Sequence, residues 1–203
     1  PAQLSLAPDL WVIGNVVARG NPLMEAILDR GDRYISGPQW LAGNVLSSKW
    51  VLAVSGRHGK TTTSSMLAWI LEAAGKSPGF LIGGIPQNFG VSARATDTPY
   101  FVVEADESDA SFLNLLPVMS VVTNIDADHM ETYGHDFGKL TGAFVEFLHR
   151  MPFYGAAVMC TDDEAVRSIL PDVSRPITSY GLGEQAQVRA HDVRAVGLAC
   201  SFG

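Results

Sequence analysis

The sequence has few charged residues and is short of basic ones. Only 17% of its 203 residues are charged, and 14 Lys and Arg residues stand against 21 Asp and Glu residues, which gives a net charge of −7. General binding to nucleic acid relies on clustered basic side chains, and this composition provides none. We therefore expect no nucleic-acid partner, and any bound phosphate group must be held by a local site.

Long apolar runs and paired cysteines are also missing. No segment approaches the roughly 20 apolar residues that a membrane-spanning helix needs, and the opening residues 1–3 lack a basic region that leads into an apolar stretch. Cys160 and Cys200 are far apart in the sequence and form no C-x-x-C spacing. We expect a cytoplasmic protein without membrane contacts, in which both cysteines are structural.

What the sequence does contain is enough apolar residues, 47%, to bury a core. Short apolar runs that read as strands lie at 10–13, 34–35, 50–54, 100–104, 119–123 and 156–160. Segments with helical spacing separate them, and this alternation is typical of β-α-β units around a parallel sheet. The sequence therefore predicts an α/β fold with a mostly parallel sheet.

Helix-capping residues and apolar stripes locate several helices. Asn21 and Pro22 form a favourable N-cap and first-turn pair, and Gly31 is placed to end that helix. Thr161 and Glu164 suit a capping box. Two helices are predicted to bury apolar stripes, namely Met66, Leu67, Ile70, Leu71 and Ala74, and Phe137, Leu140, Phe144, Phe147 and Leu148. Core packing is also expected of Trp11, Trp40 and Trp50.

Two domains are expected, with a boundary near residues 47–49. A small α/β portion would cover residues 1–48, and a larger portion would cover residues 49–203. The chain opens without the first strand and glycine turn of a nucleotide-binding domain, and it stops inside a strand-like pattern. Both domains are therefore expected to be incomplete at the chain ends.

A glycine-rich segment lies between the apolar run 50–54 and a helix. It reads Gly56-Arg57-His58-Gly59-Lys60-Thr61. In such a loop, glycines let backbone N–H groups face phosphate oxygens, the lysine supplies a charge and the threonine can bind Mg²⁺. Val54 stands where the longer form of the motif has glycine, so the match is to a shorter variant. The alternative is an ordinary glycine turn with a solvated lysine.

Acidic side chains follow two of the predicted strands. Residues 104–109 read Glu-Ala-Asp-Glu-Ser-Asp, and residues 124–130 read Asn-Ile-Asp-Ala-Asp-His-Met. The carboxyl ends of parallel strands lie at one edge of a sheet, where ligands bind, and carboxylates there can hold Mg²⁺ beside a phosphate loop. The alternative is a pair of solvated acidic loops. His129 could bind a metal or a phosphate, or it could be an ordinary surface or core histidine.

Segments 56–63, 104–109 and 123–130 together resemble the Mur ligase family, and the resemblance covers nearly the whole chain. It implies a P-loop ATPase-like central domain at 49–203, preceded by part of a Rossmann-like UDP-sugar-binding domain at 1–48. It also implies a reaction in which the carboxylate of UDP-N-acetylmuramate attacks the γ-phosphate of ATP. An amine from an amino acid or peptide then converts the resulting acyl phosphate to an amide.

The resemblance also implies residue roles. Lys60 would contact the β- and γ-phosphates, Thr61 and Glu104 would hold one Mg²⁺, and His129 would help to hold a second; Lys60, Glu104 and His129 are the expected catalytic residues. The expected nucleotide contacts are Gly56, Arg57, His58, Gly59, Lys60, Thr61, Thr62 and Asn124. The expected substrate contacts are Arg19, Asn21, Asn88, Arg94, Asp106, Ser108 and Asp109.

Within the family, the two halves of the chain differ. Residues 19–94 are similar to the ligases that attach a murein tripeptide, whereas residues 104–181 are similar to those that add L-alanine. L-Alanine is the expected amine, with the tripeptide, a non-catalytic ATP-binding fragment and a kinase of another family as alternatives. Arg57 stands where these relatives usually carry threonine. The segment 142–148 has no lysine, so no carbamylated lysine is expected.

Overall fold

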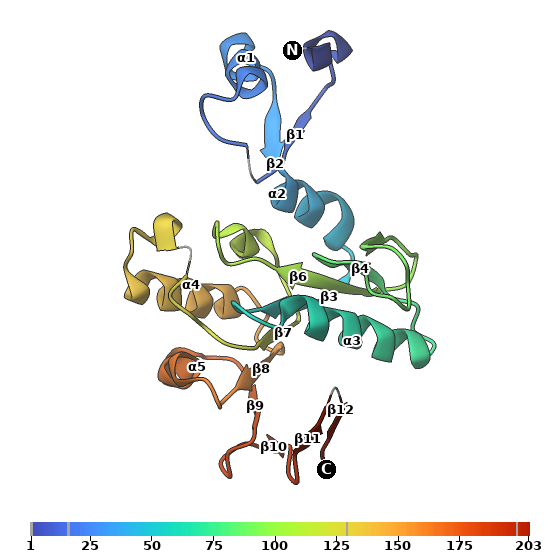
Figure 1. Ribbon diagram of the computed structural model, residues 1–203. Helices are drawn as coiled ribbons and strands as arrows, with labels where there is room; N and C mark the ends of the chain where they lie inside the picture. Colours follow the sequence, from blue (N-terminus) through green and yellow to red (C-terminus); the bar gives the residue numbers. More distant parts are fainter. Residues whose placement is uncertain (1, 16, 129, 198) are drawn as a thin grey trace. The chain divides into compact units, whose positions relative to one another are not determined.

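A computed structural model describes residues 2–15, 17–128, 130–197 and 199–203 of the chain. The chain forms two compact units, one ending at Ser48 and the other beginning at Lys49, and each is described by itself. Among the described residues, no helix is both long enough and apolar enough to cross a membrane. Figure 1 traces both units along the sequence.

The first unit is a small β-α-β arrangement. Its elements are η1 (Ala2–Leu6), β1 (Trp11–Ile13), α1 (Pro22–Arg30), β2 (Tyr34–Ser36), α2 (Gly37–Leu41) and the π-helical segment η2 (Ala42–Leu46). Strands β1 and β2 pair in parallel. The Asn21 side chain caps α1 by accepting hydrogen bonds from the backbone N–H groups of Leu23 and Met24, and Gly31 ends the helix in the left-handed conformation. The predicted bounds of this helix are confirmed.

The second unit contains an eight-stranded sheet in the order β10-β9-β8-β7-β3-β6-β4-β5. Its elements are β3 (Trp50–Ser55), α3 (Lys60–Ala73), β4 (Gly79–Leu81), β5 (Ala93–Arg94), β6 (Tyr100–Ala105), η3 (Ser111–Asn114), β7 (Met119–Val122), η4 (Met130–Tyr133), α4 (Phe137–His149), β8 (Ala156–Cys160), α5 (Glu164–Ile169), η5 (Leu170–Asp172), β9 (Ile177–Gly181) and β10 (Val188–Arg189). A separate antiparallel pair, β11 (Arg194–Val196) and β12 (Ala199–Ser201), follows. Only the β4–β5 pairing of the large sheet is antiparallel, which confirms the predicted α/β class.

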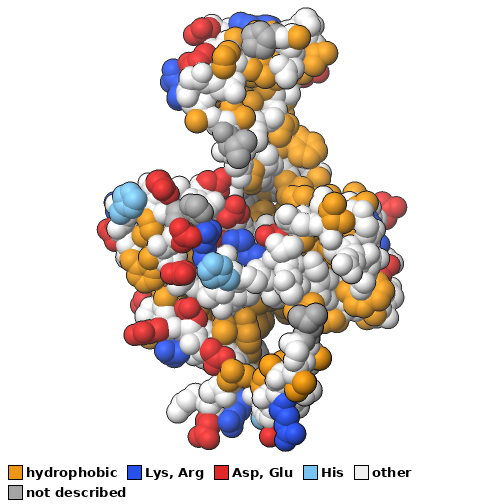
Figure 2. Space-filling view, in the orientation of Figure 1, with side chains coloured by type: hydrophobic (Ala, Val, Ile, Leu, Met, Phe, Trp, Pro, Cys, Tyr) orange, Lys and Arg blue, Asp and Glu red, His pale blue; other side chains and the backbone are white. Residues whose placement is uncertain are grey.

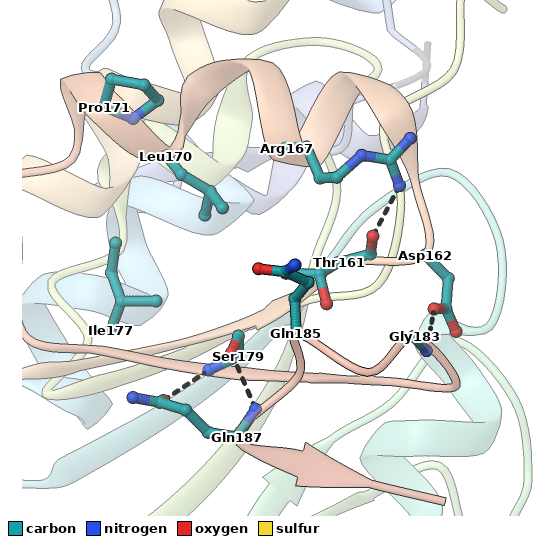
Figure 3. Close-up of a pocket in the computed structure, with 10 residues that line it drawn as sticks. All are labelled: Thr161, Asp162, Arg167, Leu170, Pro171, Ile177, Ser179, Gly183, Gln185 and Gln187. Carbon is teal, nitrogen blue, oxygen red and sulfur yellow. Dashed lines mark hydrogen bonds between the residues drawn. The ribbon is translucent and has the colours of Figure 1, made fainter.

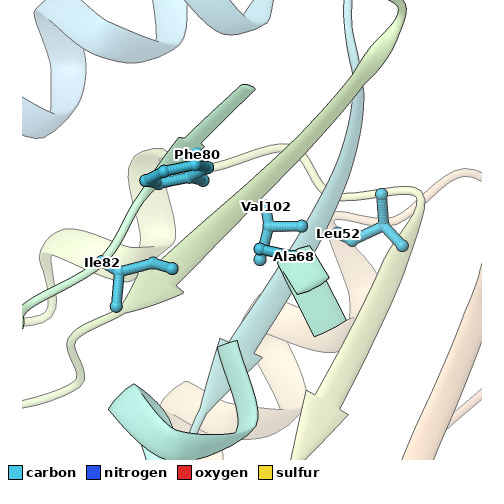
Figure 4. Packing of buried hydrophobic residues seen from close by; sticks show 5 residues of the cluster. All are labelled: Leu52, Ala68, Phe80, Ile82 and Val102. Carbon is cyan, nitrogen blue, oxygen red and sulfur yellow. The ribbon is translucent and has the colours of Figure 1, made fainter. Parts of the chain in front are cut away.

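The central strand β3 lies between β6 and β7. Its residues 51–55 are all buried. On one face of the sheet, α3 packs over a core cluster made of Leu52, Ala68, Phe80, Ile82 and Val102 (Figure 4). Because side chains alternate along a strand, Val51 and Ala53 point to the opposite face, and they are buried as well. Both faces of β3 are therefore covered, as its continuous apolar run predicts.

A second apolar cluster anchors the segment that follows β6. The ring of Phe112, in η3, packs against Phe144 and Phe147 of α4 with centroid distances of 5.4 and 4.7 Å. All three rings are buried. This packing fixes the far end of the acidic segment 104–109. The predicted stripe of α4 is confirmed at Leu140, Phe144, Phe147 and Leu148, whereas Phe137, the first residue of the helix, is 39% exposed.

The inner face of α3 differs from the predicted stripe. Met66 and Ile70 are 54% and 62% exposed, whereas Ser64 and Ala68 are fully buried. The helix meets the sheet through these two small residues, and only small side chains allow a backbone to approach a sheet this closely. Leu67 and Leu71 flank the contact and pack on the core cluster.

The predicted capping box at Thr161 is wrong. Asp163 caps α5 by accepting a hydrogen bond of 2.8 Å from the Val166 N–H. Thr161 instead continues the β8–β9 pairing, since its backbone N–H donates to the Tyr180 carbonyl at 2.8 Å and its hydroxyl donates to the same oxygen at 3.2 Å. A residue held in an extended ladder is not available to cap a helix.

Two of the expected core tryptophans are also exposed. Trp50, the first residue of β3, is 60% exposed and meets the Tyr100 ring edge-on, and Trp40 is 36% exposed. Cys200 is exposed and Cys160 is half-buried, and both are free thiols. Trp50 stands at the start of its strand, where the sheet ends, so its apolar character does not ensure burial.

Candidate functional site

The loop between β3 and α3 depends on two glycines. Gly56 has φ +125°, and a Cβ atom there would collide with the Thr123 side chain and the Asn124 backbone. Gly59 has φ +82° and forms the N-cap of α3, so a side chain at either position would be strained. The loop thus delivers the chain to the N-terminus of a 14-residue helix, where the helix dipole favours an anion.

The segment after β7 holds this loop in place through His58. The Thr123 hydroxyl and the Asn124 amide nitrogen donate to the His58 carbonyl at 2.7 and 2.9 Å. The His58 N–H in turn donates to the Asn124 side-chain oxygen at 2.8 Å. The Asn124 amide therefore positions the loop backbone.

Lys60, the first residue of α3, reaches the acidic segment after β6. Its Nζ lies 2.9 Å from Glu107 and 3.8 Å from Asp106. Glu107 is only 5% exposed. The Tyr133 hydroxyl donates to the Glu107 backbone carbonyl at 2.5 Å. Burial, together with the nearby carboxylates, raises the pKa of Tyr133 to about 12.

Thr61 and Glu104 form a pair of oxygen donors. The Thr61 hydroxyl donates to one carboxylate oxygen of Glu104 at 3.1 Å, and the Gly83 N–H donates to the other at 2.8 Å. A hydroxyl and a carboxylate oxygen are hard ligands of the kind that Mg²⁺ takes. No group of three or more His, Cys, Asp or Glu residues suited to a metal occurs in the described part of the chain. A site with few protein ligands fits Mg²⁺, which commonly completes its shell with phosphate oxygens and water.

Arg57 and His58 face the acidic segment after β7. Arg57 forms an ion pair with Asp128, and His58 Nε2 lies 3.8 Å from the Asp126 carboxylate. Figure 2 shows acidic, basic and histidine side chains crowded together on one face of the second unit. His129, the expected ligand of a second metal, lies outside the described residues.

The sequence and the fold of the chain are both similar to those of known proteins. Residues 54–201 match the model of the Mur ligase middle domain. This chain belongs to the Mur ligase family. It is 58% identical over 195 residues to the UDP-N-acetylmuramate–L-alanine ligase of Variovorax paradoxus (strain S110), a match that covers 96% of this chain and 40% of that relative.

Two further relatives place this Mur ligase chain more closely. The UDP-N-acetylmuramate–L-alanine ligase of Acidovorax sp. (strain JS42) is 64% identical over 151 residues, which cover 74% of this chain and 32% of the relative. The solved UDP-N-acetylmuramate:L-alanyl-gamma-D-glutamyl-meso-diaminopimelate ligase from Neisseria meningitides has a TM-score of 0.88 and 41% identity over 97% of this chain and 65% of that one. The chain thus spans 40% and 32% of the lengths of the two curated L-alanine ligases.

In this Mur ligase middle domain, three expected substrate contacts shape the acidic segment itself. The Asp106 carboxylate accepts from the Ser108 N–H at 3.2 Å, and the Asp109 carboxylate accepts from the Ser111 N–H at 2.8 Å. The Ser108 carbonyl accepts from the Thr132 hydroxyl at 2.7 Å. Of the three, Asp106 lies 3.8 Å from Lys60 Nζ, and the part of all three in substrate binding stays a prediction.

The other expected substrate contacts make interactions of their own, with partners other than Lys60. Arg94 donates to the Pro78 carbonyl, pairs with Glu72 and stacks 5.2 and 4.9 Å from the ring centroids of Phe80 and Phe89. Asn88 lines a shallow pocket over α3 with Trp69. Arg19 and Asn21 belong to the first unit, where Arg19 forms a two-point ion pair with Glu25 and Asn21 caps α1.

The Mur ligase domain has another pocket, of about 920 Å³, at the carboxyl ends of β8 and β9 (Figure 3). Arg167 and Asp162 line it, and both make hydrogen bonds within the protein. The Arg167 guanidinium donates to the Thr161 carbonyl at 2.6 Å, and the Asp162 carboxylate accepts from the Leu182 N–H at 2.9 Å. Asp162 therefore stabilises the turn after β9, and Arg167 links α5 to the end of β8.

Sequence reasoning missed three contributors to the site. Glu107 lies in the acidic segment that was singled out, but its burial beside Lys60 gave no local signal. Asp128 likewise lies in a recognised segment. Gly83 bonds Glu104 through its backbone, and a Cβ atom there would lie 3.0 Å from the Glu104 carboxylate. The Gly83-Gly84 pair was a visible signal of close backbone approach.

Proposed function

We propose that this chain is the nucleotide-binding part of an ATP-dependent ligase that joins UDP-N-acetylmuramate to L-alanine in the cytoplasm during peptidoglycan synthesis. The names of the curated relatives support L-alanine as the amine, since relatives at 58% and 64% identity are named for it. The solved relative named for the tripeptide is 41% identical. The higher identities favour L-alanine over the tripeptide.

The observation that carries this proposal is the grouping of Lys60, Thr61 and Glu104 at the N-terminus of α3. Lys60 and Thr61 are the first two residues of α3, and the Glu104 carboxylate is hydrogen-bonded to the Thr61 hydroxyl. A cation, a hydroxyl and a carboxylate therefore surround a helix N-terminus, which favours an anion. Phosphoryl transfer needs mainly positioning and charge stabilisation, and these groups provide both. Neither a solvated glycine turn nor a solvated acidic loop would require Glu107 to be buried beside Lys60.

In the proposed reaction, the muramyl carboxylate oxygen attacks the γ-phosphorus of ATP, and the bond from that phosphorus to the ADP oxygen breaks. The amine then attacks the acyl carbon, loses a proton and displaces phosphate. Lys60 would move its ammonium from Glu107 to the β- and γ-phosphate oxygens. Thr61 and Glu104 would hold Mg²⁺, which when bound offsets the negative charge of the phosphates.

We further propose that residues 1–48 are part of a UDP-sugar-binding domain and that residues 49–203 form the ATP-binding domain. The parallel β1–β2 pair with α1 between its strands supports this assignment, because such a unit is the building block of nucleotide-binding folds. Arg19 and Asn21 would lie at its substrate-facing turn. Their present partners within the unit are Glu25 and the start of α1.

Calorimetric titration of the 203-residue chain with a non-hydrolysable ATP analogue tests the nucleotide site. We expect binding that strengthens with Mg²⁺. Lys60→Ala should weaken it by about tenfold or more, since a charge-assisted hydrogen bond contributes about 1.5–3 kcal/mol. Glu104→Gln should keep the binding measured without Mg²⁺ and lose the gain that Mg²⁺ provides.

Lys76→Ala is the matched control. Lys76 is an exposed lysine just beyond the C-terminal end of α3, at the opposite end of the helix from the site. The Lys76→Ala variant should bind the ATP analogue as tightly as the wild type does. Thermal melting shows whether each variant is folded. If Lys60→Ala and Lys76→Ala bind equally well, the assignment of the phosphate loop is wrong.

A further inference from the structure

Arg57 lies in the phosphate loop, but the proposed reaction gives it no part. Its guanidinium forms an ion pair with Asp128 through Nη2. Its side chain is 22% exposed, and its Nε is buried with no hydrogen-bond partner in the described part of the chain. A buried donor without an acceptor costs free energy, so a ligand that accepts a hydrogen bond from Nε would stabilise the guanidinium in a new position.

The geometry of the guanidinium defines the kind of ligand that would suit it. Arginine presents its N–H donors as a planar fork, which matches two oxygens of a phosphate or carboxylate. Asp128 contacts Nη2, whereas Nε has no acceptor. A tetrahedral phosphate group could accept from both nitrogens.

The backbone around Arg57 is fixed, so only its side chain can move. Gly56 is confined by Thr123 and Asn124, and both backbone polar atoms of His58 are hydrogen-bonded to that same segment. Side-chain rotation about a rigid backbone keeps the guanidinium at the mouth of the loop. Asp128 follows β7 and α3 follows β3, and these two strands are neighbours in the sheet, so Asp128 and the N-terminus of α3 lie at the same sheet edge.

The two cations of the loop are held very differently. Lys60 pairs with Glu107, whose side chain is 7% exposed, whereas Arg57 pairs with Asp128, whose side chain is 54% exposed. Solvent screens an ion pair whose carboxylate is exposed, so the Arg57–Asp128 pair is the easier one to open. His58 and Asp126 also face this region, and their side chains are 69% and 62% exposed.

We propose that Arg57 is a phosphate-binding residue, and that it pairs with Asp128 as long as no nucleotide is bound. When the triphosphate enters, the guanidinium leaves Asp128 and takes a phosphate oxygen, so that Asp128 acts as a competitor for the nucleotide. This inference rests on the proposed nucleotide-binding function. The other role for the pair is a fixed latch, in which Arg57–Asp128 simply holds the segment after β7 against the loop.

The two roles predict opposite effects of Asp128→Asn. If Asp128 competes with phosphate, its neutralisation frees Arg57 and tightens binding by about threefold, in line with the small strength of an ion pair that solvent screens at its carboxylate. If the pair is a latch, the same change loosens the loop and weakens binding.

Two variants of Arg57 separate its charge from its shape. Arg57→Met keeps the aliphatic stem without the charge and should weaken binding by about tenfold. Arg57→Lys keeps the charge without the fork of donors, and its affinity should lie between those of the wild type and Arg57→Met.

The experiment is a double-mutant cycle on the 203-residue chain. Wild type, Arg57→Met, Asp128→Asn and the double variant are titrated with the ATP analogue and with tripolyphosphate, in buffer containing EDTA so that side-chain contacts dominate. Asp128→Asn should tighten binding in the wild-type background and have no effect in the Arg57→Met background. Arg150→Met and Glu146→Gln, which alter an exposed pair at the end of α4, should leave binding unchanged.

Several results would overturn the proposal. The first is that Asp128→Asn binds the ATP analogue more weakly than the wild type or equally well. The second is that Asp128→Asn raises the affinity equally in the wild-type and Arg57→Met backgrounds. The third is that a folded Arg57→Met binds as tightly as the wild type. Wild-type chain that binds no nucleotide would contradict the proposed function as well. Weakened binding in Lys60→Ala with unchanged binding in both Arg57 variants would contradict this inference alone.

Discussion

At the scale of single residues, Glu107 is the centre of the polar network. It is buried, Lys60 neutralises it at 2.9 Å, and Tyr133 hydrogen-bonds to its backbone carbonyl. A buried carboxylate without a cation is strongly unfavourable. Lys60 therefore stabilises the fold as well as providing the expected phosphate contact. The phosphate oxygens of a nucleotide must interact with Lys60 more strongly than the Glu107 carboxylate does.

Tyr133 should make the stability of the protein fall at alkaline pH. Its folded-state pKa of about 12 lies above the ordinary value of 10.0, so the folded state favours the neutral phenol. This contribution is complete below pH 10 and is lost as the pH rises towards 12. Tyr133→Phe should lose about 1 kcal/mol at neutral pH through its missing hydrogen bond, yet lose less than the wild type between pH 10 and 12.

Urea unfolding of both proteins at several pH values measures this effect. The exposed Tyr154→Phe is the control and should follow the wild type throughout. Burial also raises the pKa of Tyr180, so the informative quantity is the difference in unfolding free energy between Tyr133→Phe and the wild type. A difference that does not change with pH would contradict the assignment.

At the scale of elements, the order of strands brings the site together. Strands β6 and β7 flank β3, so their carboxyl ends place Glu104 and Asn124 on either side of the phosphate loop. Helix α3 approaches the sheet through Ser64 and Ala68, which keeps its N-terminus close to these strand ends. The segment after β4 adds a hydrogen bond from the Gly83 N–H to the Glu104 carboxylate.

Phe80 should be a main stabilising residue of this layer. It is fully buried on β4, its ring centroid lies 4.6 Å from that of Phe89, and Arg94 covers its face. Phe80→Ala should lower the free energy of unfolding by about 3–5 kcal/mol, because it removes buried apolar area and leaves a cavity. Leu81→Ala, at the next residue and 39% exposed, should have a much smaller effect in urea unfolding. Equal losses in both variants would contradict the packing described here.

At the scale of the whole molecule, the site is assembled from segments that are distant in sequence. The loop at 55–61, the backbone of Gly83, the acidic segment at 104–107 and residues 123–128 meet at one sheet edge. Such a site forms only when the sheet is complete. Nucleotide binding should therefore be lost together with the fold of the second unit.

The ligase proposal can be tested by exchange with a relative. The matched 195 residues of the Variovorax paradoxus relative are replaced by this chain, and amide formation from UDP-N-acetylmuramate, L-alanine and ATP is assayed. We expect activity to be retained, because the phosphate-transfer groups come from this chain, and to be lost in the same exchange with Lys60→Ala. A folded exchange protein that binds ATP without forming amide would contradict the ligase function while leaving nucleotide binding intact.

Local sequence determined much of this protein. Asn21, Pro22 and Gly31 defined α1 because capping and left-handed glycine are properties of a few adjacent residues. The apolar run of β3 and the glycine loop before α3 were likewise readable, since each depends on its own residues. The α/β class followed from the alternation of these elements.

Tertiary structure alone decided which side chains meet. Asp163 caps α5 because Thr161 is engaged by β9, and Met66 and Ile70 are exposed because α3 meets the sheet through its small residues. The pairing of Lys60 with Glu107 and of Arg57 with Asp128 depends on β6 and β7 being the two neighbours of β3. Sequence periodicity indicates that a helix has an apolar face and that a strand ends in carboxylates, but the order of strands determines what those groups contact.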